Sequence, residues 1–139
     1  MSSTVLVVED EADIMLTLRL TLQAEGYRVV GVSTGEEALA IFHQSPPDVT
    51  VLDIGLPGID GLEVVRQLRA NPTLSGSRII VSSAHASGDV RKLTEALHCG
   101  AYLTKPFSSK ELVATVGAVL ASAAPMGELM VRGRGSTAV

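Results

Sequence analysis

Five side chains that could do chemistry each lie at the end of a short apolar run. They are three acids, a hydroxyl and an amine: Glu9, Asp10, Asp53, Ser83 and Lys105. Carboxylates held in one cleft repel one another unless a hard cation lies between them, and an all-oxygen ligand set favours Mg²⁺. A carboxylate can also attack phosphorus to form an aspartyl phosphate, while an amine and a hydroxyl can bind the transferred group. If the fold brings them together, these residues predict phosphoryl chemistry.

Each of these residues also has a purely structural interpretation. Asp10 could cap the helix that follows it, and Asp53 could be a loop carboxylate before the LPGIDG turn. Ser83 could satisfy a backbone group at a strand end, and Lys105 could be a surface lysine before a proline. Their joint placement after four separate apolar runs favours the chemical interpretation over the structural one.

The apolar runs themselves predict strands. They are continuous and rich in β-branched residues, which is typical of strands buried on both faces. The predicted strands are Val5–Val8, Tyr27–Val32, Val49–Leu52, Ile79–Val81 and Ala101–Thr104.

Segments with helical periodicity separate and follow these strands. The first carries Ile14 and Leu18 on one face and ends at Gly26, and the fourth runs from about Ser87 to His98. The other three begin at residues with a Glu three positions later, which is the capping-box spacing. These N-terminal residues are Ser33 or Thr34, Asp60 and Ser108.

Five strand–helix units predict an α/β fold with a parallel sheet and right-handed crossovers. In such sheets ligands bind beyond the carboxyl ends of the strands. The five polar side chains are therefore expected at one edge of the sheet. The periodicity ends near residue 121, so we expect one domain over residues 1–121 and a flexible tail or linker over 122–139.

Composition limits the class of protein. The chain has 139 residues, of which 46% are apolar and only 3% aromatic, so its core is expected to be aliphatic. A single cysteine excludes an internal disulfide and a Cys-rich zinc site. There is no transmembrane run and no secretory signal, so a cytoplasmic location is expected. The net charge of −4 gives no basic footprint, and we expect neither nucleic-acid binding nor membrane binding by this segment.

Four ordered stretches resemble the receiver domain of two-component response regulators. They are VLVVEDE, VLDIGLPGIDG, IIVSSA and YLTKPF, at Val5–Glu11, Val51–Gly61, Ile79–Ala84 and Tyr102–Phe107. The resemblance covers about residues 4 to 121, and the spacings between the motifs also match. It implies a doubly wound, flavodoxin-like fold with five parallel strands in the order 2-1-3-4-5 and five helices.

The resemblance also implies roles for single residues. Asp53 would be phosphorylated by a histidine kinase or a histidine phosphotransfer protein. Mg²⁺, or Mn²⁺ in its place, would be held by Asp10, Asp53 and the backbone carbonyl of Gly55, with Glu9 acting through water. Such a domain promotes only its own phosphorylation and dephosphorylation, so it is not expected to be an enzyme in the usual sense.

Three further residues would report or stabilise the phosphoryl group. Ser83 and Lys105 would contact it, and Tyr102 would be the aromatic switch that turns inward when Ser83 moves. Lys105–Pro106 is similar to the cis peptide of the family. The switch would change the face made by the fourth helix, fifth strand and fifth helix, and so control a partner or output domain that the sequence does not identify.

Two other functions fit parts of the pattern. A metal-dependent aspartyl phosphatase would need a second acid two residues after Asp53, where this chain has Gly55. A pseudo-receiver would bind partners without phosphorylation, but the presence of Asp53, Lys105 and the two upstream acids argues against it.

Overall fold

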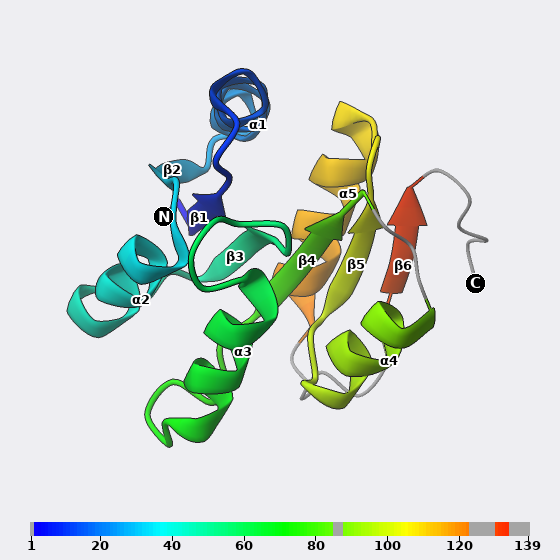
Figure 1. The fold of residues 1–139 in the computed structure, drawn as a ribbon. Helices are drawn as coiled ribbons and strands as arrows, with labels where there is room; N and C mark the ends of the chain where they lie inside the picture. Colours follow the sequence, from blue (N-terminus) through cyan, green and yellow to red (C-terminus); the bar gives the residue numbers. More distant parts are fainter. Residues whose placement is uncertain (1, 85–87, 123–129, 134–139) are drawn as a thin grey trace.

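The computed structural model describes residues 2–84, 88–122 and 130–133 as an α/β sheet structure (Figure 1). Strands and helices alternate along the chain up to residue 121. The strands are β1 (Thr4–Val8), β2 (Arg28–Val32), β3 (Val49–Asp53), β4 (Ile79–Ser83), β5 (Ala101–Thr104) and β6 (Met130–Gly133). The helices are α1 (Ala12–Ala24), α2 (Gly35–Gln44), α3 (Gly61–Ala70), α4 (Gly88–Ala96) and α5 (Ser109–Ala121).

All strand pairs in the sheet are parallel, in the order β2-β1-β3-β4-β5-β6. The first five strands confirm the predicted order 2-1-3-4-5. The order reverses between β1 and β3, which places the carboxyl ends of these two strands at the switch point of the sheet.

Helices cover both faces of the sheet (Figure 1). On one face, α2, α3 and α4 pack on a cluster that includes Leu6 and Val8 of β1. On the other, α1 and α5 pack on a cluster that includes Val5 and Val7 of the same strand. Alternate residues of a strand point to opposite faces, so one continuous apolar run supplies both halves of the aliphatic core.

Helix boundaries follow from capping. The side chains of Thr34, Asp60 and Ser108 accept hydrogen bonds from the backbone N–H groups of Glu37, Glu63 and Glu111, respectively. Only Ser108 forms the full reciprocal capping box; the Glu37 carboxylate instead accepts from the N–H of Ser33. These caps set where α2, α3 and α5 begin, as the Glu spacing predicts.

Arg69 joins α3 to the segment between α4 and β5. Its guanidinium donates to three backbone oxygens, those of Leu97 at 2.8 Å, Ser75 at 2.8 Å and His98 at 3.3 Å. No sequence pattern predicts this role of Arg69, because its acceptors are backbone carbonyls, which any residue type can supply.

The sequence predicts no regular element after residue 121, and here the prediction was incomplete. Met130–Gly133 form β6, which pairs with β5 from Ala101↔Met130 to Thr104↔Gly133. A sheet edge offers unpaired backbone groups to any extended segment, so strand addition does not require hydrophobic periodicity. The rest of the predicted tail, residues 123–129 and 134–139, lies outside the described residues.

Within the described part of the chain, none of the helices has the length and apolar character needed to cross a membrane.

Candidate functional site

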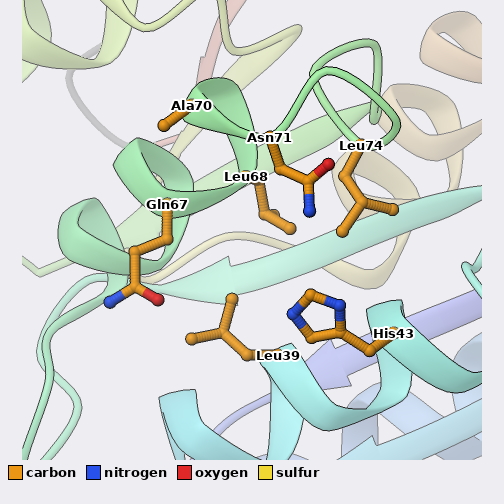
Figure 2. A pocket seen from close by; sticks show the side chains of 7 residues that line it. All are labelled: Leu39, His43, Gln67, Leu68, Ala70, Asn71 and Leu74. Atoms are coloured by element: carbon orange, nitrogen blue, oxygen red, sulfur yellow. The ribbon is translucent and has the colours of Figure 1, made fainter.

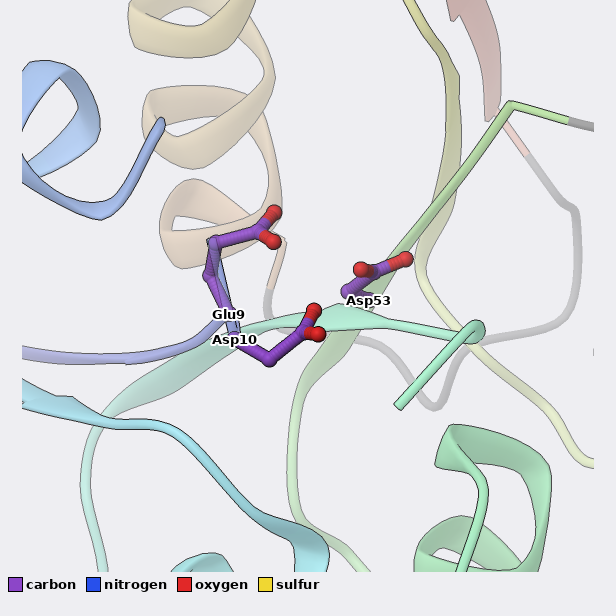
Figure 3. A group of neighbouring side chains, drawn as sticks. All are labelled: Glu9, Asp10 and Asp53. Carbon is purple, nitrogen blue, oxygen red and sulfur yellow. The ribbon is translucent and has the colours of Figure 1, made fainter. Parts of the chain in front are cut away.

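The ends of β1 and β3 bring three acidic side chains together. One carboxylate oxygen from each of Glu9, Asp10 and Asp53 lies within 4.8 Å of the others. Figure 3 shows the three side chains extending into one space beyond the carboxyl ends of the strands. Glu9 and Asp53 are buried, whereas Asp10 is exposed. The structure therefore places the three acids at the edge that the sequence predicts.

Asp10 does not cap the following helix. The N-cap of α1 is Glu11, which makes no side-chain cap hydrogen bond. Asp10 is therefore not explained as a helix cap. Its carboxylate faces Asp53 across the site (Figure 3).

Lys105 lies between two of the acids. Its Nζ is 2.9 Å from Glu9 Oε1 and 3.3 Å from Asp53 Oδ2. Lys105 directly follows β5, Glu9 directly follows β1 and Asp53 ends β3, so the sheet brings the backbones of the three residues to one edge. One ammonium cannot neutralise three carboxylates, and the site retains an excess of negative charge.

Burial and the ion pairs have opposite effects on the groups of this site. Burial raises the pKa of Glu9, and the hydrogen bonds from Lys105 and from the N–H of Glu11 only partly offset this. Burial alone would lower the pKa of Lys105, but the carboxylates of Glu9 and Asp53 outweigh it and raise the pKa above its usual value. The lysine is therefore held in its charged form, facing Asp53.

The loop after β3 fixes the orientation of Asp53. Its Oδ1 accepts a hydrogen bond from the N–H of Gly55 at 3.1 Å. The N–H of Gly61 donates to the carbonyl of Ile54 at 3.1 Å, which folds the loop back onto the strand. A Cβ on Gly61 would lie only 2.5 Å from the backbone oxygen of Asp53. Helix α3 can begin this close to the site only because residue 61 is glycine.

Ser83 and Lys105 lie at the ends of neighbouring strands. The N–H of Lys105 donates to the carbonyl of Ser83 at 2.8 Å, and Ser83 pairs with Thr104 in the sheet. Ser83 is buried, and the strand next to its own carries Asp53. The structure thus brings the predicted hydroxyl residue to the same edge as the acids. The Lys105–Pro106 peptide is cis, as the resemblance implies.

Tyr102 is fully buried in the structure. It belongs to the cluster packed under α2, α3 and α4, and the Arg91 guanidinium carbon lies 5.8 Å from its ring centroid. The ring therefore lies inside the core, on the face of the sheet that α2, α3 and α4 cover.

A separate pocket of about 450 Å³ opens between α2 and α3 (Figure 2). Its lining includes Leu39 and His43 from α2 and Gln67 from α3. None of the site residues contributes to it, so this pocket and the acidic site are distinct features.

Sequence reasoning missed two features of the site. It assigned Glu9 to the metal alone, whereas Glu9 Oε1 contacts Lys105 directly and Oε2 accepts from the N–H of Glu11 at 3.1 Å. It also missed the close approach of Gly61 to Asp53. The length of the Glu9 side chain is the signal for the first, because a Glu reaches further across the sheet edge than an Asp would.

An acid-lined switch point on this doubly wound sheet, with a lysine beside Asp53, is the arrangement of a signalling receiver domain. The family model for the response regulator receiver domain matches residues 5–117. The chain therefore belongs to the response regulator receiver domain family.

Known proteins agree with this assignment. The chain is 40% identical over 118 residues to the transcriptional regulatory protein KdpE of Mycobacterium tuberculosis, covering 84% of this chain and 50% of that protein. It is 39% identical over 119 residues to the phosphate regulon transcriptional regulatory protein PhoB of Rhizobium meliloti, covering 86% and 52%. The structure is similar to the chemotaxis response regulator CheY4 of Vibrio cholerae, with a TM-score of 0.80 and 28% identity over 86% of this chain and 99% of that one.

The chain spans about half the length of the curated relatives it matches.

Proposed function

We propose that this chain accepts a phosphoryl group on Asp53 from a histidine kinase or a histidine phosphotransfer protein. The bond from an Asp53 carboxylate oxygen to phosphorus forms as the phosphorus–nitrogen bond of the donor phosphohistidine breaks, and the imidazole leaves with the electron pair. The observation that carries the proposal is the position of Lys105 Nζ, 3.3 Å from Asp53 Oδ2 and between the carboxylates.

The donor set fits a hard divalent cation. Three carboxylates within 4.8 Å share one ammonium, and only oxygen ligands are present among them, which matches Mg²⁺ or Mn²⁺. Asp10, Asp53 and the carbonyl of Gly55 would hold the ion, with Glu9 acting through water. When bound, the ion would offset charge on the phosphoryl oxygens.

The remaining residues of the site would position and sense the phosphoryl group. Lys105 would move part of its contact from Asp53 to a phosphoryl oxygen, and Ser83 would donate its hydroxyl hydrogen to another. Tyr102, on the strand between Ser83 and the sheet edge, would carry this change to the face made by α4, β5 and α5. The chain would promote only its own phosphorylation and dephosphorylation.

Control of a downstream protein or output domain would follow from that change of face. Relatives that are transcriptional regulators support an output in gene expression, exerted by a part that residues 1–121 do not supply. Residues 122–139 would then be a tail or linker. A cytoplasmic location follows from the proposed phosphoryl donors.

A labelled small-molecule phosphodonor tests the proposal directly. The wild-type chain should take up label only in the presence of Mg²⁺ or Mn²⁺, and Asp53→Asn should take up none. Asp60→Asn is the matched control, because it removes an acid from the same loop while Asn can still cap α3.

Equal labelling of Asp53→Asn and wild type would overturn the assignment of Asp53. No labelling of the wild type by any donor would favour the pseudo-receiver alternative, and release of phosphate from added phosphoesters would favour the phosphatase.

A further inference from the structure

The outer edge of β5 is covered by β6, a strand of four residues in the same chain. The two strands are parallel, with Tyr102 paired to Val131 and Thr104 to Gly133. Among the described residues β6 is the last strand of the sheet, so it has one strand neighbour only. It therefore lies at the edge of the α4, β5 and α5 face.

β6 is a short strand at the edge of the described sheet. It is four residues long and ends in glycine, and eight residues separate it from the end of α5. A short edge strand gains few backbone hydrogen bonds, and each contributes little net free energy after the loss of bonds to water.

β6 pairs with β5, whose carboxyl end leads directly into Lys105 of the acidic site. Ser83, Thr104 and Gly133 form one row across β4, β5 and β6. Lys105 follows Thr104 and donates its N–H to the carbonyl of Ser83 at 2.8 Å. A displacement of Ser83 and Lys105 toward Asp53 therefore moves the end of β5 on which the end of β6 is held.

We propose that Met130–Gly133 is a removable cover of the output face, docked on β5 in the unphosphorylated chain and released when Asp53 is phosphorylated. The edge of β5 is then a strand-docking site whose resident occupant is this segment of the chain. The release step rests on the proposed function, whereas the docking itself does not. The coupling free energy is the same in both directions: release of Met130–Gly133 from β5 favours phosphorylation as strongly as phosphorylation favours that release.

The docking is tested on the full chain with a pair of double variants. Val131→Pro/Arg132→Pro removes two successive backbone N–H groups. Successive N–H groups of a strand point to opposite sides, so one of the two must point toward β5. Val131→Thr/Arg132→Lys keeps both N–H groups and is the matched control. Amide hydrogen exchange of β5 should be roughly tenfold or more faster in the proline variant than in wild type and control. Amides of β2, at the opposite edge, should not change.

A peptide of residues 126–137 gives a second measurement that does not depend on exchange. Labelled with fluorescein, it should bind the proline variant and not the wild-type chain, whose edge is occupied. The same peptide with both prolines should bind neither. Equal β5 exchange in all three chains, or no binding of the peptide to the proline variant, would overturn the docking.

Release is tested with beryllofluoride and Mg²⁺, which mimic the phosphoryl group on Asp53. In wild type the outer amides of β5 should then exchange as fast as in the proline variant, and the peptide should bind. Unchanged exchange in a chain that accepts label on Asp53 would overturn the release step. A chain that accepts no label would overturn the proposed function and the release step together, while the docking is decided by the proline variant alone.

Discussion

Lys105 Nζ lies closer to Glu9 than to Asp53, at 2.9 Å from Glu9 Oε1 against 3.3 Å from Asp53 Oδ2. The lysine that faces the central aspartate is thus also the partner of a buried acid from β1. Glu9 is only 3% exposed, and its second oxygen is bound by the N–H of Glu11. Both of its oxygens are therefore engaged by the protein, which distinguishes it from the exposed Asp10.

Metal affinity should depend more on Asp10 than on Glu9. Asp10→Asn removes a carboxylate that faces Asp53, and we expect a loss of Mg²⁺ affinity of roughly tenfold to a hundredfold. Glu9→Gln removes a carboxylate whose oxygens already bind Lys105 and Glu11, and the loss should be smaller. A calorimetric Mg²⁺ titration of both variants measures this. Equal losses would mean that both acids ligate the ion directly.

Removal of the lysine should destabilise the fold through Glu9. In Lys105→Met the buried Glu9 carboxylate has no cation, and we expect the free energy of unfolding at pH 7 to fall by about 3 kcal/mol. Glu9→Gln/Lys105→Met should recover part of that loss, because the buried charge of Glu9 is then absent. Urea unfolding of the wild type, the two single variants and the double variant gives the coupling.

The pH dependence of that variant follows from the pKa of Glu9. Burial raises this pKa above its ordinary value of 4.5, whereas Lys105 lowers it, so the folded variant without Lys105 binds the proton more tightly than the wild type does. The cost of the buried charge is therefore present above the raised pKa and falls as the pH is lowered through it toward 4.5. The loss in the free energy of unfolding caused by Lys105→Met should therefore be smaller at pH 5 than at pH 7. If the loss of stability were the same at both pH values, the buried charge of Glu9 would not be its cause.

Two glycines in helices should respond oppositely to alanine. Gly117 in α5 has nothing within 4 Å of an added Cβ, so Gly117→Ala should stabilise the chain by about 0.5–1 kcal/mol. In Gly61→Ala the Cβ would meet the backbone of Asp53 and Ile54 at 2.5 and 2.9 Å, and overpacking should destabilise by about 1–3 kcal/mol. Thermal unfolding measures both. Stabilisation by Gly61→Ala would contradict the packing of α3 on the site.

Cys99 should be unreactive in the folded chain. Burial raises the pKa of its thiol to about 12, despite the opposing effect of Arg69. The thiolate is the reactive form, so reaction with an aromatic disulfide reagent should be slow at pH 8 and limited by opening of the structure. In denaturant one thiol per chain should react at once. Rapid reaction under native conditions would show that the segment before β5 opens readily.

Most of the fold could be predicted because its signals are local. Apolar runs place β1 to β5 within a residue or two of their observed bounds, and the Glu spacing locates the starts of α2, α3 and α5. Gly26, at φ 91°, follows α1 as its C′ residue, as the sequence predicts. The carboxyl edge of a parallel sheet then brings Asp10, Asp53 and Lys105 together.

The features that could not be predicted depend on contacts between segments distant in the sequence. The ion pair of Glu9 with Lys105 spans 96 residues and depends on how far one side chain reaches. The approach of Gly61 to Asp53 depends on the path of a loop, and β6 depends on an open backbone edge. None of these leaves a periodic pattern in the residue types.

The three carbonyls held by Arg69 restrict how α4 can move. Two of them, those of Leu97 and His98, directly follow the helix, and the donor belongs to α3. The last turn of α4 is therefore fixed to a neighbour that itself packs against Asp53 through Gly61. A displacement of α4 that keeps these bonds while α3 stays in place is a rotation about the carboxyl-terminal end of α4. Its amplitude increases along the helix toward Gly88, the end nearer in sequence to Ser83. A small shift at the end of β4 would then produce a larger displacement at the first turn of α4, because the helix rotates about its far end.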